Sequence, residues 1–298
     1  MDKTIRRWKG VQSVAIYTVL FIVSFFMIFP IYWTFTTAFK APKDVLTSPP
    51  KFIPFVDFQP SLFALQELGL VSGADRGTRT TPHSPDEIIR VIRNSIVIAV
   101  GSTLLSLLIG CLAAYGLVRF NYRRWNNQSI SFFILSQRMM PPIVLVIPYF
   151  ILFRHLNLLD TLLGVAIAHS IGSIPFVVWI MRGFFISIPR ELEDSARIDG
   201  CSYLGAFLRV IIPLSIPGLV AASVFVFVFS WNELLFALTL SFRNARTIPV
   251  LLTGLTHGGA PLWWSLSAML LISMLPVIVM TIFIQRYIVS GLTLGAIK

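Results

Sequence analysis

Residues 187–213 read SIPRELEDSARIDGCSYLGAFLRVIIP, a polar run between two long apolar stretches. The stretch before it, Thr161–Met181, contains no acidic or basic residue other than a histidine, and the stretch after it, Leu214–Leu240, contains a single carboxylate. About 20 apolar residues in a helix cross the hydrocarbon core of a bilayer. The pattern therefore predicts two membrane-spanning helices joined by a polar loop.

The composition of the whole chain points the same way. Of its 298 residues, 56% are hydrophobic and only 12% are charged, and the mean hydropathy is +0.80. A soluble domain carries roughly 25% charged residues. A chain with so little polar surface is suited to lipid, where each backbone polar group must be satisfied inside a helix or a closed barrel. We expect an all-α integral membrane protein with about six transmembrane helices.

The apolar runs give an expected organisation. Residues 1–10 form a short basic segment, residues 11–39 the first span, and residues 40–93 a long polar loop outside the cell. Residues 72–85, SGADRGTRTTPHSP, predict a mobile part of that loop. Residues 94–298 form the main transmembrane domain, with spans expected near 94–118, 129–153, 161–181, 214–240 and 265–284.

The distribution of basic residues predicts the topology. Six spans place both termini on one side, and most Lys and Arg residues of the short loops fall on that side. Basic residues of short loops favour the cytoplasm, so both termini are expected there. The formal net charge of +11 then reflects topology, and nucleic acid is not an expected partner because no dense basic patch exists.

The polar loop itself predicts a short helix. Pro189 suits a helix start, and Glu191, Glu193 and Asp194 then fall in the first turns, where the helix dipole favours acids. Gly200 is expected to end the helix. Two interpretations stay open on physical grounds: an amphipathic turn on the membrane surface, or a docking element for a soluble partner. The acidic charge on a side that faces anionic lipid favours docking.

Four polar residues within the spans are candidates for a solute path. Arg138 costs at least ~2.5 kcal/mol to insert at mid-membrane, so it should line a cavity, pair with an acid, or cap carbonyls near Pro141-Pro142. Asn232 and Glu233 could line the path or contact a partner chain, and Glu233 could pair with Arg138. For His169 a buried, hydrogen-bonded role is favoured over ligand contact.

Other residues have simpler expected roles. Asn94 and Ser95 are expected to cap the second span. Cys111 and Cys201 have no nearby ligands at metal-binding spacing, so no metal site is expected. The chain has no G-x-x-x-x-G-K-[ST] phosphate loop and no evident nucleophile–base pair. We therefore expect no catalytic residue and no cofactor in this chain.

A set of motifs resembles one protein family. The run ELEDSARIDG, followed by IIPLSIPGL, resembles the EAA loop of bacterial ABC-importer permeases. The resemblance to the carbohydrate-uptake class, and to the second membrane subunit of maltose-type systems, covers nearly all of the chain except residues 40–90. It is carried also by NSIVIAV, AAYGLVRF, MMPPIVLVIPYF, LLDTLLG, IPFVVWIMRGFF, FSWNELLFAL and YIVSGLTLGAIK.

The resemblance implies a non-catalytic permease in the bacterial inner membrane that imports a sugar or sugar derivative. Implied partners are a second, homologous permease, an external sugar-binding protein and two ATPase subunits, which would hold ATP and Mg. The loop would be a cytoplasmic coupling helix between spans four and five that seats in the ATPase. Asp194-Ser195-Ala196 stands where the family usually has Glu-Ala-Ala, so the shorter Asp194 changes any particular salt bridge. The implied coupling residues are Glu191, Asp194, Ser195, Ala196, Asp199 and Gly200.

Two other functions fit the sequence less well. A secondary transporter driven by an ion gradient predicts repeated halves and mid-membrane ion ligands, but no repeat is evident and Glu233 is the main carboxylate candidate. A membrane scaffold or membrane enzyme has no use for an acidic docking loop. Arg138 is compatible with an anionic or highly hydroxylated sugar.

Overall fold

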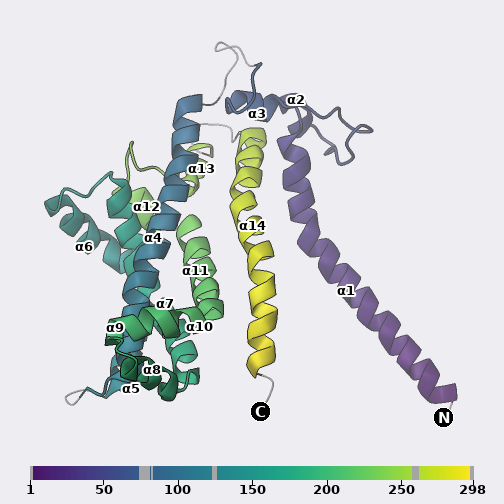
Figure 1. Cartoon of the computed structure of the whole chain (residues 1–298). Helices are drawn as coiled ribbons and strands as arrows, with labels where there is room; N and C mark the ends of the chain where they lie inside the picture. Colours follow the sequence, from purple (N-terminus) through teal and green to yellow (C-terminus); the bar gives the residue numbers. More distant parts are fainter. Residues whose placement is uncertain (1–2, 74–80, 82, 123–125, 257–261, 296–298) are drawn as a thin grey trace. The chain divides into compact units, whose positions relative to one another are not determined.

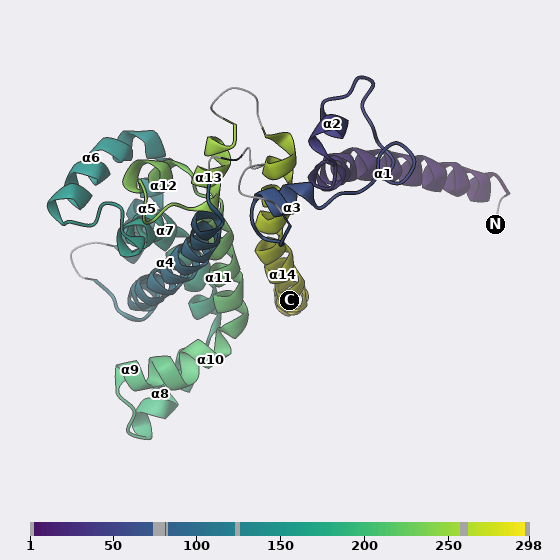
Figure 2. The same ribbon diagram turned by 90° about the horizontal axis from the view of Figure 1, so that it is seen from above.

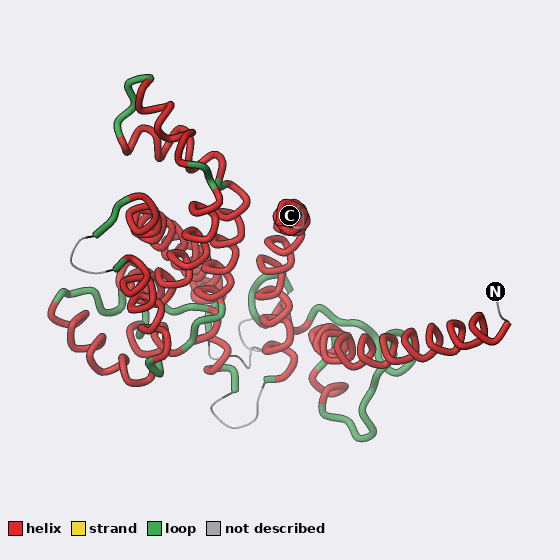
Figure 3. Tube along the Cα trace, turned by 90° about the horizontal axis from the view of Figure 1, so that it is seen from below, coloured by secondary structure: helices red, strands yellow, loops and turns green. Residues whose placement is uncertain are grey.

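The computed structural model describes residues 3–73, 81, 83–122, 126–256 and 262–295. Helices make up the regular structure of this part of the chain (Figure 3), and its one β-type pairing is an isolated bridge between Pro54 and Phe58. Four helices are long and apolar enough to cross a membrane: α1 (Lys3–Ala38), α4 (Pro85–Arg119), α7 (Leu162–Ser187) and α14 (Trp263–Gly295).

Two bent helix pairs bring the number of candidate spans to six. The first pair joins α5 (Asn127–Ser136) and the 3-10 turn η1 (Gln137–Met139) to α6 (Pro142–His155), and the second ends in α11 (Ile216–Trp231). The expectation of an all-α protein with about six spans is confirmed. The remaining elements are α2 (Pro42–Val45), α3 (Phe63–Glu67), α8 (Arg190–Ile198), α9 (Tyr203–Ala206), η2 (Phe207–Ile211), α10 (Ile212–Leu214), α12 (Leu235–Leu240) and α13 (Ile248–Gly254).

Helix α4 begins at Pro85, well before the expected start at Asn94. The Ser84 hydroxyl accepts the backbone N–H of Glu87 at 3.2 Å, and Pro85 occupies the first helical position. Asp86 and Glu87 add negative charge to the first turn. These are the usual features of a helix start, so the stretch EIIRVIR belongs to the helix and not to the loop before it.

The third expected span, residues 129–153, is not a straight helix. Its two halves meet at an angle of 93° around Pro141 and Pro142. Proline has no N–H to donate and disfavours helix in the residue before it. The two consecutive prolines therefore end η1 and begin α6, which places Arg138 at the bend.

The fifth expected span, residues 214–240, is interrupted as well. Helix α11 ends at Trp231, and α12 starts at Leu235. The Glu233 carboxylate accepts the backbone N–H groups of Phe236 and Ala237 at 3.0–3.1 Å. An acceptor at this place satisfies donors that a new helix leaves free, so the polar triplet Trp231-Asn232-Glu233 separates two helices.

The chain divides into two compact units, and the larger one contains residues 89–253 and 275–298. Its core lies where α4, α7 and α11 pack on η2 (Figure 1). A second cluster joins α6 and α12 to α7 and to the first part of α4. The principal buried residues of the first cluster are Cys111, Ala114, Tyr115, Val177, Met181, Phe185, Phe207, Ile211, Ala222 and Val226.

The smaller unit contains residues 1–88 and 254–274, and much of the long loop is folded in it. Lys40 is buried, donates to the Lys51 carbonyl at 2.6 Å and lies 4.1 Å from the centre of the Trp33 ring. Burial lowers the pKa of Lys40, although Asp44 and Asp57 act in the opposite direction. The segment expected to be mobile falls largely on residues 74–80 and 82, which lie outside the described residues.

A buried carboxylate fastens the loop to the start of α14 in the same unit. Glu67 accepts hydrogen bonds from the Trp264 indole N–H and the Ser265 hydroxyl, the latter at 2.8 Å. A buried charge is tolerated when donors surround it. The loop is therefore held by specific polar contacts as well as by aromatic packing of Phe63 on Trp264.

Candidate functional site

Helix α8 forms within the polar loop, as its sequence predicts. Its N-cap is Pro189, and its last turn closes through a bond from the Asp199 N–H to the Ser195 carbonyl at 3.0 Å. Gly200 follows with φ = +91° and has no neighbour within 4 Å of where a Cβ would lie. A glycine in the left-handed region is a common helix end, so Gly200 ends α8 as expected.

The predicted coupling residues lie on an accessible surface of α8. Ala196 is half-buried, and the other five are exposed. Ile198, on the same helix, is 86% exposed, which is unusual for a large apolar side chain next to acids. Figure 2 shows α8, α9 and α10 projecting from the bundle around α4 and α7. This arm thus leaves acidic and apolar side chains accessible at its surface.

Glu193 has the opposite environment, and sequence reasoning left it out of the candidate site. It is 4% exposed, lies 2.7 Å from Arg119 Nε as an ion pair, and accepts a hydrogen bond from the Tyr115 hydroxyl. Arg119 also donates to the Ile188 carbonyl at 3.2 Å, and Arg190 donates to the Val118 carbonyl at 3.0 Å. These contacts tie both ends of the α7–α8 turn to the end of α4.

The sequence does contain a signal for this anchor. Tyr115 and Arg119 are four residues apart, so they share one face at the end of an apolar helix. An arginine that shares a helix face with a tyrosine at such a place favours pairing with an acid, and the loop contains several acids. Which acid points inward depends on the rotation of α8 about its own axis, and the packing of α9 and η2 sets that rotation.

Aromatic packing fixes the rotation of α8 relative to the end of α4. The Tyr115 ring lies 4.6 Å from the Phe207 ring, and Phe120 lies 5.3 Å from Tyr203. The guanidinium of Arg197 lies 3.9 Å from the centre of the Tyr203 ring, a favourable cation–π distance. Helices α8, α9 and η2 are therefore packed against the end of α4 and do not form a loosely attached loop.

His169 and Glu233 meet in a buried polar cluster. His169 Nδ1 lies 2.8 Å from the Ser230 hydroxyl, and His169 Nε2 lies 2.9 Å from a Glu233 carboxylate oxygen. The expectation of a buried, hydrogen-bonded histidine agrees with this geometry. The alternative pairing of Glu233 with Arg138 is not formed, because the Glu233 carboxylate is occupied by His169 and by the start of α12. Asn232 is exposed and donates to the Val228 carbonyl at 2.8 Å.

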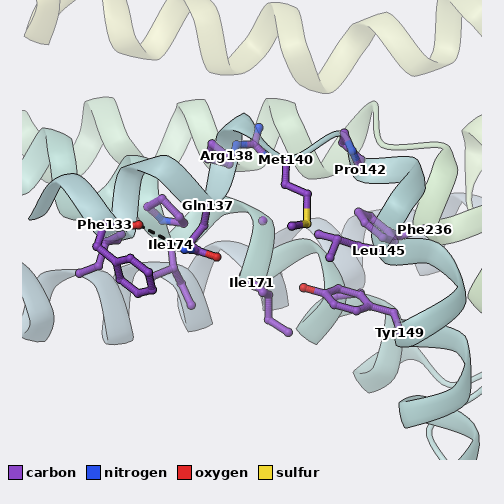
Figure 4. A pocket seen from close by; sticks show the side chains of 14 residues that line it. Phe133, Gln137, Arg138, Met140, Pro142, Leu145, Tyr149, Ile171, Ile174 and Phe236 are labelled. Carbon is purple, nitrogen blue, oxygen red and sulfur yellow. Dashed lines mark hydrogen bonds between the residues drawn. The ribbon is translucent and has the colours of Figure 1, made fainter. Parts of the chain in front are cut away.

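Arg138 is half-buried at the bend between η1 and α6. Its guanidinium carbon lies 4.7 Å from the centres of both the Phe176 and Phe229 rings. It lines a cavity of about 340 Å³ together with Gln137 and Tyr149 (Figure 4). Among the described residues no carboxylate lies at ion-pair distance from Arg138, so of the three roles considered for this charge the ion pair is not formed.

Asp160, which sequence reasoning missed, lies in the turn between α6 and α7 and holds the segment after α12. Its carboxylate accepts the backbone N–H groups of residues 242–245 at 2.9–3.1 Å. Burial alone would raise the pKa of Asp160, but these four hydrogen bonds together hold it below its usual range. The carboxylate therefore acts as an ionised anchor for the segment after α12.

Asn94 and Ser95 hold the far end of the same segment. Asn94 donates to the carbonyls of Asn244 and Arg246 at 2.7 and 3.1 Å, and the Ser95 hydroxyl accepts the N–H of Ile248 at 2.8 Å. The expectation that this pair caps its own helix was wrong, since both residues lie inside α4. Ser95 instead satisfies the first N–H of α13.

Comparison with known proteins assigns a family. Residues 106–294 match the family described as "Binding-protein-dependent transport system inner membrane component". The diacetylchitobiose uptake system permease protein of Streptomyces coelicolor is 31% identical over 98% of this chain and 97% of its own length. The trehalose/maltose transport system permease protein of Thermococcus litoralis is 36% identical over 70% of this chain and 74% of its own length.

The fold also resembles a solved structure. A chain of a bacterial ABC transporter involved in the import of the acidic polysaccharide alginate aligns with a TM-score of 0.72 at 22% identity, over 96% of this chain and 98% of that one. At this identity the likeness shows a shared fold.

Proposed function

Because this chain belongs to the family of binding-protein-dependent transport system inner membrane components, we propose that it is a permease subunit of an ATP-driven importer for a sugar or sugar derivative. The observation that carries the proposal is helix α8, which exposes an acidic face to a partner while Glu193 fixes it to α4. Relatives named for the uptake of diacetylchitobiose and of trehalose and maltose support a sugar as the solute.

The coupling step follows from this arrangement. A separate ATPase, which holds ATP and Mg, seats α8 through Glu191, Asp194, Ser195, Asp199 and Gly200. Ala196 is half-buried at the same place and lets the ATPase approach closely. When ATP binding moves α8, the Glu193–Arg119 pair and the Arg190–Val118 contact carry the displacement into α4. Packed helices with two discrete arrangements are what such coupling requires.

The complete transporter also needs partners on its other surfaces. A second, related permease would complete the solute path. Two ATPase subunits would bind on the cytoplasmic side, and an external binding protein would deliver the sugar. An apolar groove along α11 supports the permease contact. The groove has a volume of about 930 Å³ and is lined by residues that include Ala221, Val224, Phe225, Val228 and Asn232.

The experiment is to purify the chain with the products of its neighbouring genes and to measure ATP hydrolysis in the presence of loaded binding protein. We expect stimulated hydrolysis in the wild-type complex. Asp194→Arg and Gly200→Arg should lose most of the stimulation. The first places a bulky base on the docking face, and the second does so at a φ of +91°, which an arginine adopts only with strain, so it also disturbs the end of α8. Gln59→Arg, at an exposed position of the long loop, is the matched control. Full stimulation in both α8 variants would contradict the coupling role.

A further inference from the structure

Arg138 carries a charge that the described part of the chain does not balance. It lies at the bend of a membrane-spanning helix pair, and no carboxylate is within ion-pair distance among the described residues. The acid that was the best candidate, Glu233, is already engaged by His169 and by the N–H groups of α12. A half-buried cation in a membrane-spanning segment is normally paired or hydrogen-bonded, so a further anionic group would complete this site.

The geometry shows which part of Arg138 is available. Phe176 and Phe229 lie against the guanidinium, each with its ring centre 4.7 Å from the guanidinium carbon. Rings at this distance occupy the space next to the charged group but provide no hydrogen-bond acceptor in the plane of the guanidinium. The in-plane N–H groups of an arginine match the two oxygens of a carboxylate or another oxyanion.

Helix α7 leaves room beside these donors. Gly172 faces Arg138, and a Cβ at Gly172 would lie 3.4 Å from Nη1, so a larger side chain would compete for the same space. The glycine therefore allows the guanidinium to lie close to α7, beside the cavity that Arg138 lines.

The cavity has the size and lining of a small-molecule site. Its volume of about 340 Å³ falls at the lower end of the usual range for ligand pockets. Figure 4 shows the Tyr149 hydroxyl and the Gln137 amide both turned towards Ile171, while aromatic and aliphatic side chains form most of the wall. Such a wall suits the C–H faces of a sugar ring, and the two polar groups suit its hydroxyls.

We propose that this cavity is a subsite on the solute path that binds the acidic group of an anionic sugar through Arg138. The proposal rests on the proposed function, since it assigns a substrate class to the same importer. The oxyanion lies on the free edge of the guanidinium, and Tyr149 and Gln137 hydrogen-bond to hydroxyl groups of the ring. The acidic group of the solute then supplies the anionic partner for Arg138 that the described residues do not provide.

The test uses the complete transporter reconstituted in liposomes with its binding protein. The probes are glucuronate, digalacturonate, glucose 6-phosphate and glucose 6-sulfate, with glucose, α-1,4-galactobiose, maltose and trehalose as neutral probes. Import is measured per ATP hydrolysed. We expect at least one anionic probe to be imported at least tenfold faster than its neutral counterpart, and the set identifies which oxyanion is preferred.

Variants then assign the preference to the cavity. Arg138→Gln should lower import of the anionic probe at least tenfold while the binding protein still stimulates hydrolysis, and Arg138→Lys should recover part of the import. Tyr149→Phe should raise the KM a few-fold. Arg154→Gln, at an exposed arginine of the same helix pair, should import at the wild-type rate.

Three results would overturn the subsite. They are preferred import of a neutral probe, unchanged import of the anionic probe by Arg138→Gln, and failure of that variant to assemble, which would place Arg138 in a subunit contact. Failure of the proposed function is distinguishable, because the wild-type complex would then neither import any probe nor show stimulated hydrolysis.

Discussion

At the scale of single residues, neighbouring acids of α8 have different environments. Glu193 is buried against Arg119 and Tyr115, whereas Glu191 and Asp194 are exposed. Asp194 lies 3.9 Å from Arg197, but both side chains are largely exposed, and such pairs contribute little to stability. The residue that resembles the family motif and the residue that anchors the helix are thus different residues.

Replacement of Glu193 tests the anchor. Glu193→Ala leaves Arg119 without its buried partner, and loss of one member of a buried pair costs about 3–5 kcal/mol. We expect a clear drop in the thermal midpoint of the purified complex and loss of ATPase stimulation. Glu191→Ala, at an exposed position, should change stability by less than about 0.5 kcal/mol. Equal stability of the two variants would show that the buried contact does not hold α8.

Asp160 provides a pH-dependent test. Its pKa is depressed in the folded protein, so its contribution to stability is present above its unfolded pKa of about 3.9 and is lost as the pH falls through the lower folded value. Asp160→Asn should therefore be less stable than the wild type at pH 7, and the difference should persist to about pH 4 and shrink below it. Thermal unfolding across this pH series measures the difference, and a gap that stays constant below pH 4 would contradict the role of the charge.

At the scale of secondary-structure elements, polar residues decide where helices break. Glu233 follows the end of α11 and caps the start of α12 by accepting the N–H groups of Phe236 and Ala237. Pro141-Pro142 separates η1 from α6. The mean hydropathy over about 20 residues predicts a single span in each region, because a few polar or proline residues hardly change that average. The break at the prolines follows from the covalent limits of proline, which are a local property of the sequence, whereas the break at Glu233 depends on a side-chain contact.

The contact between His169 and Glu233 joins α7 to the start of α12. Glu233→Ala should destabilise the protein more than His169→Phe, since it removes both the histidine partner and the acceptor for two backbone N–H groups. A double-mutant cycle should give a coupling of between about 0.5 and 3 kcal/mol. Asn232→Ala is the control, because among the described residues the Asn232 side chain donates to the Val228 carbonyl of α11 and is not hydrogen-bonded to His169 or Glu233. Additive effects of the two substitutions would show that the contact does not stabilise the protein.

At the scale of the whole molecule, four long helices and two bent pairs make up the membrane domain. An even number of crossings would return the chain to the side on which it started, and we expect that side to be the cytoplasm because most basic residues of the short loops fall there. Residues 187–213 are then expected on the side where an ATPase is available.

Fusion reporters test this topology. Alkaline phosphatase, which is active only outside the inner membrane, should be inactive when fused after Lys298 and active when fused after Ser72 in the long loop. A fluorescent protein that folds only in the cytoplasm should give the reverse result. Phosphatase activity at Lys298 would contradict the assignment and would remove α8 from the reach of the ATPase.

The sequence by itself determined the all-α membrane architecture, most of the spans, and the short helix that ends at Gly200. Hydropathy, proline geometry and glycine at a positive φ are local properties, so they can be read along the chain. Only the tertiary structure decided that Glu193 is the anchor, that Glu233 pairs with His169, and that Ser95 caps α13. These contacts join residues far apart in the chain, and which side chains meet depends on how α4, α7 and the α11 region pack together.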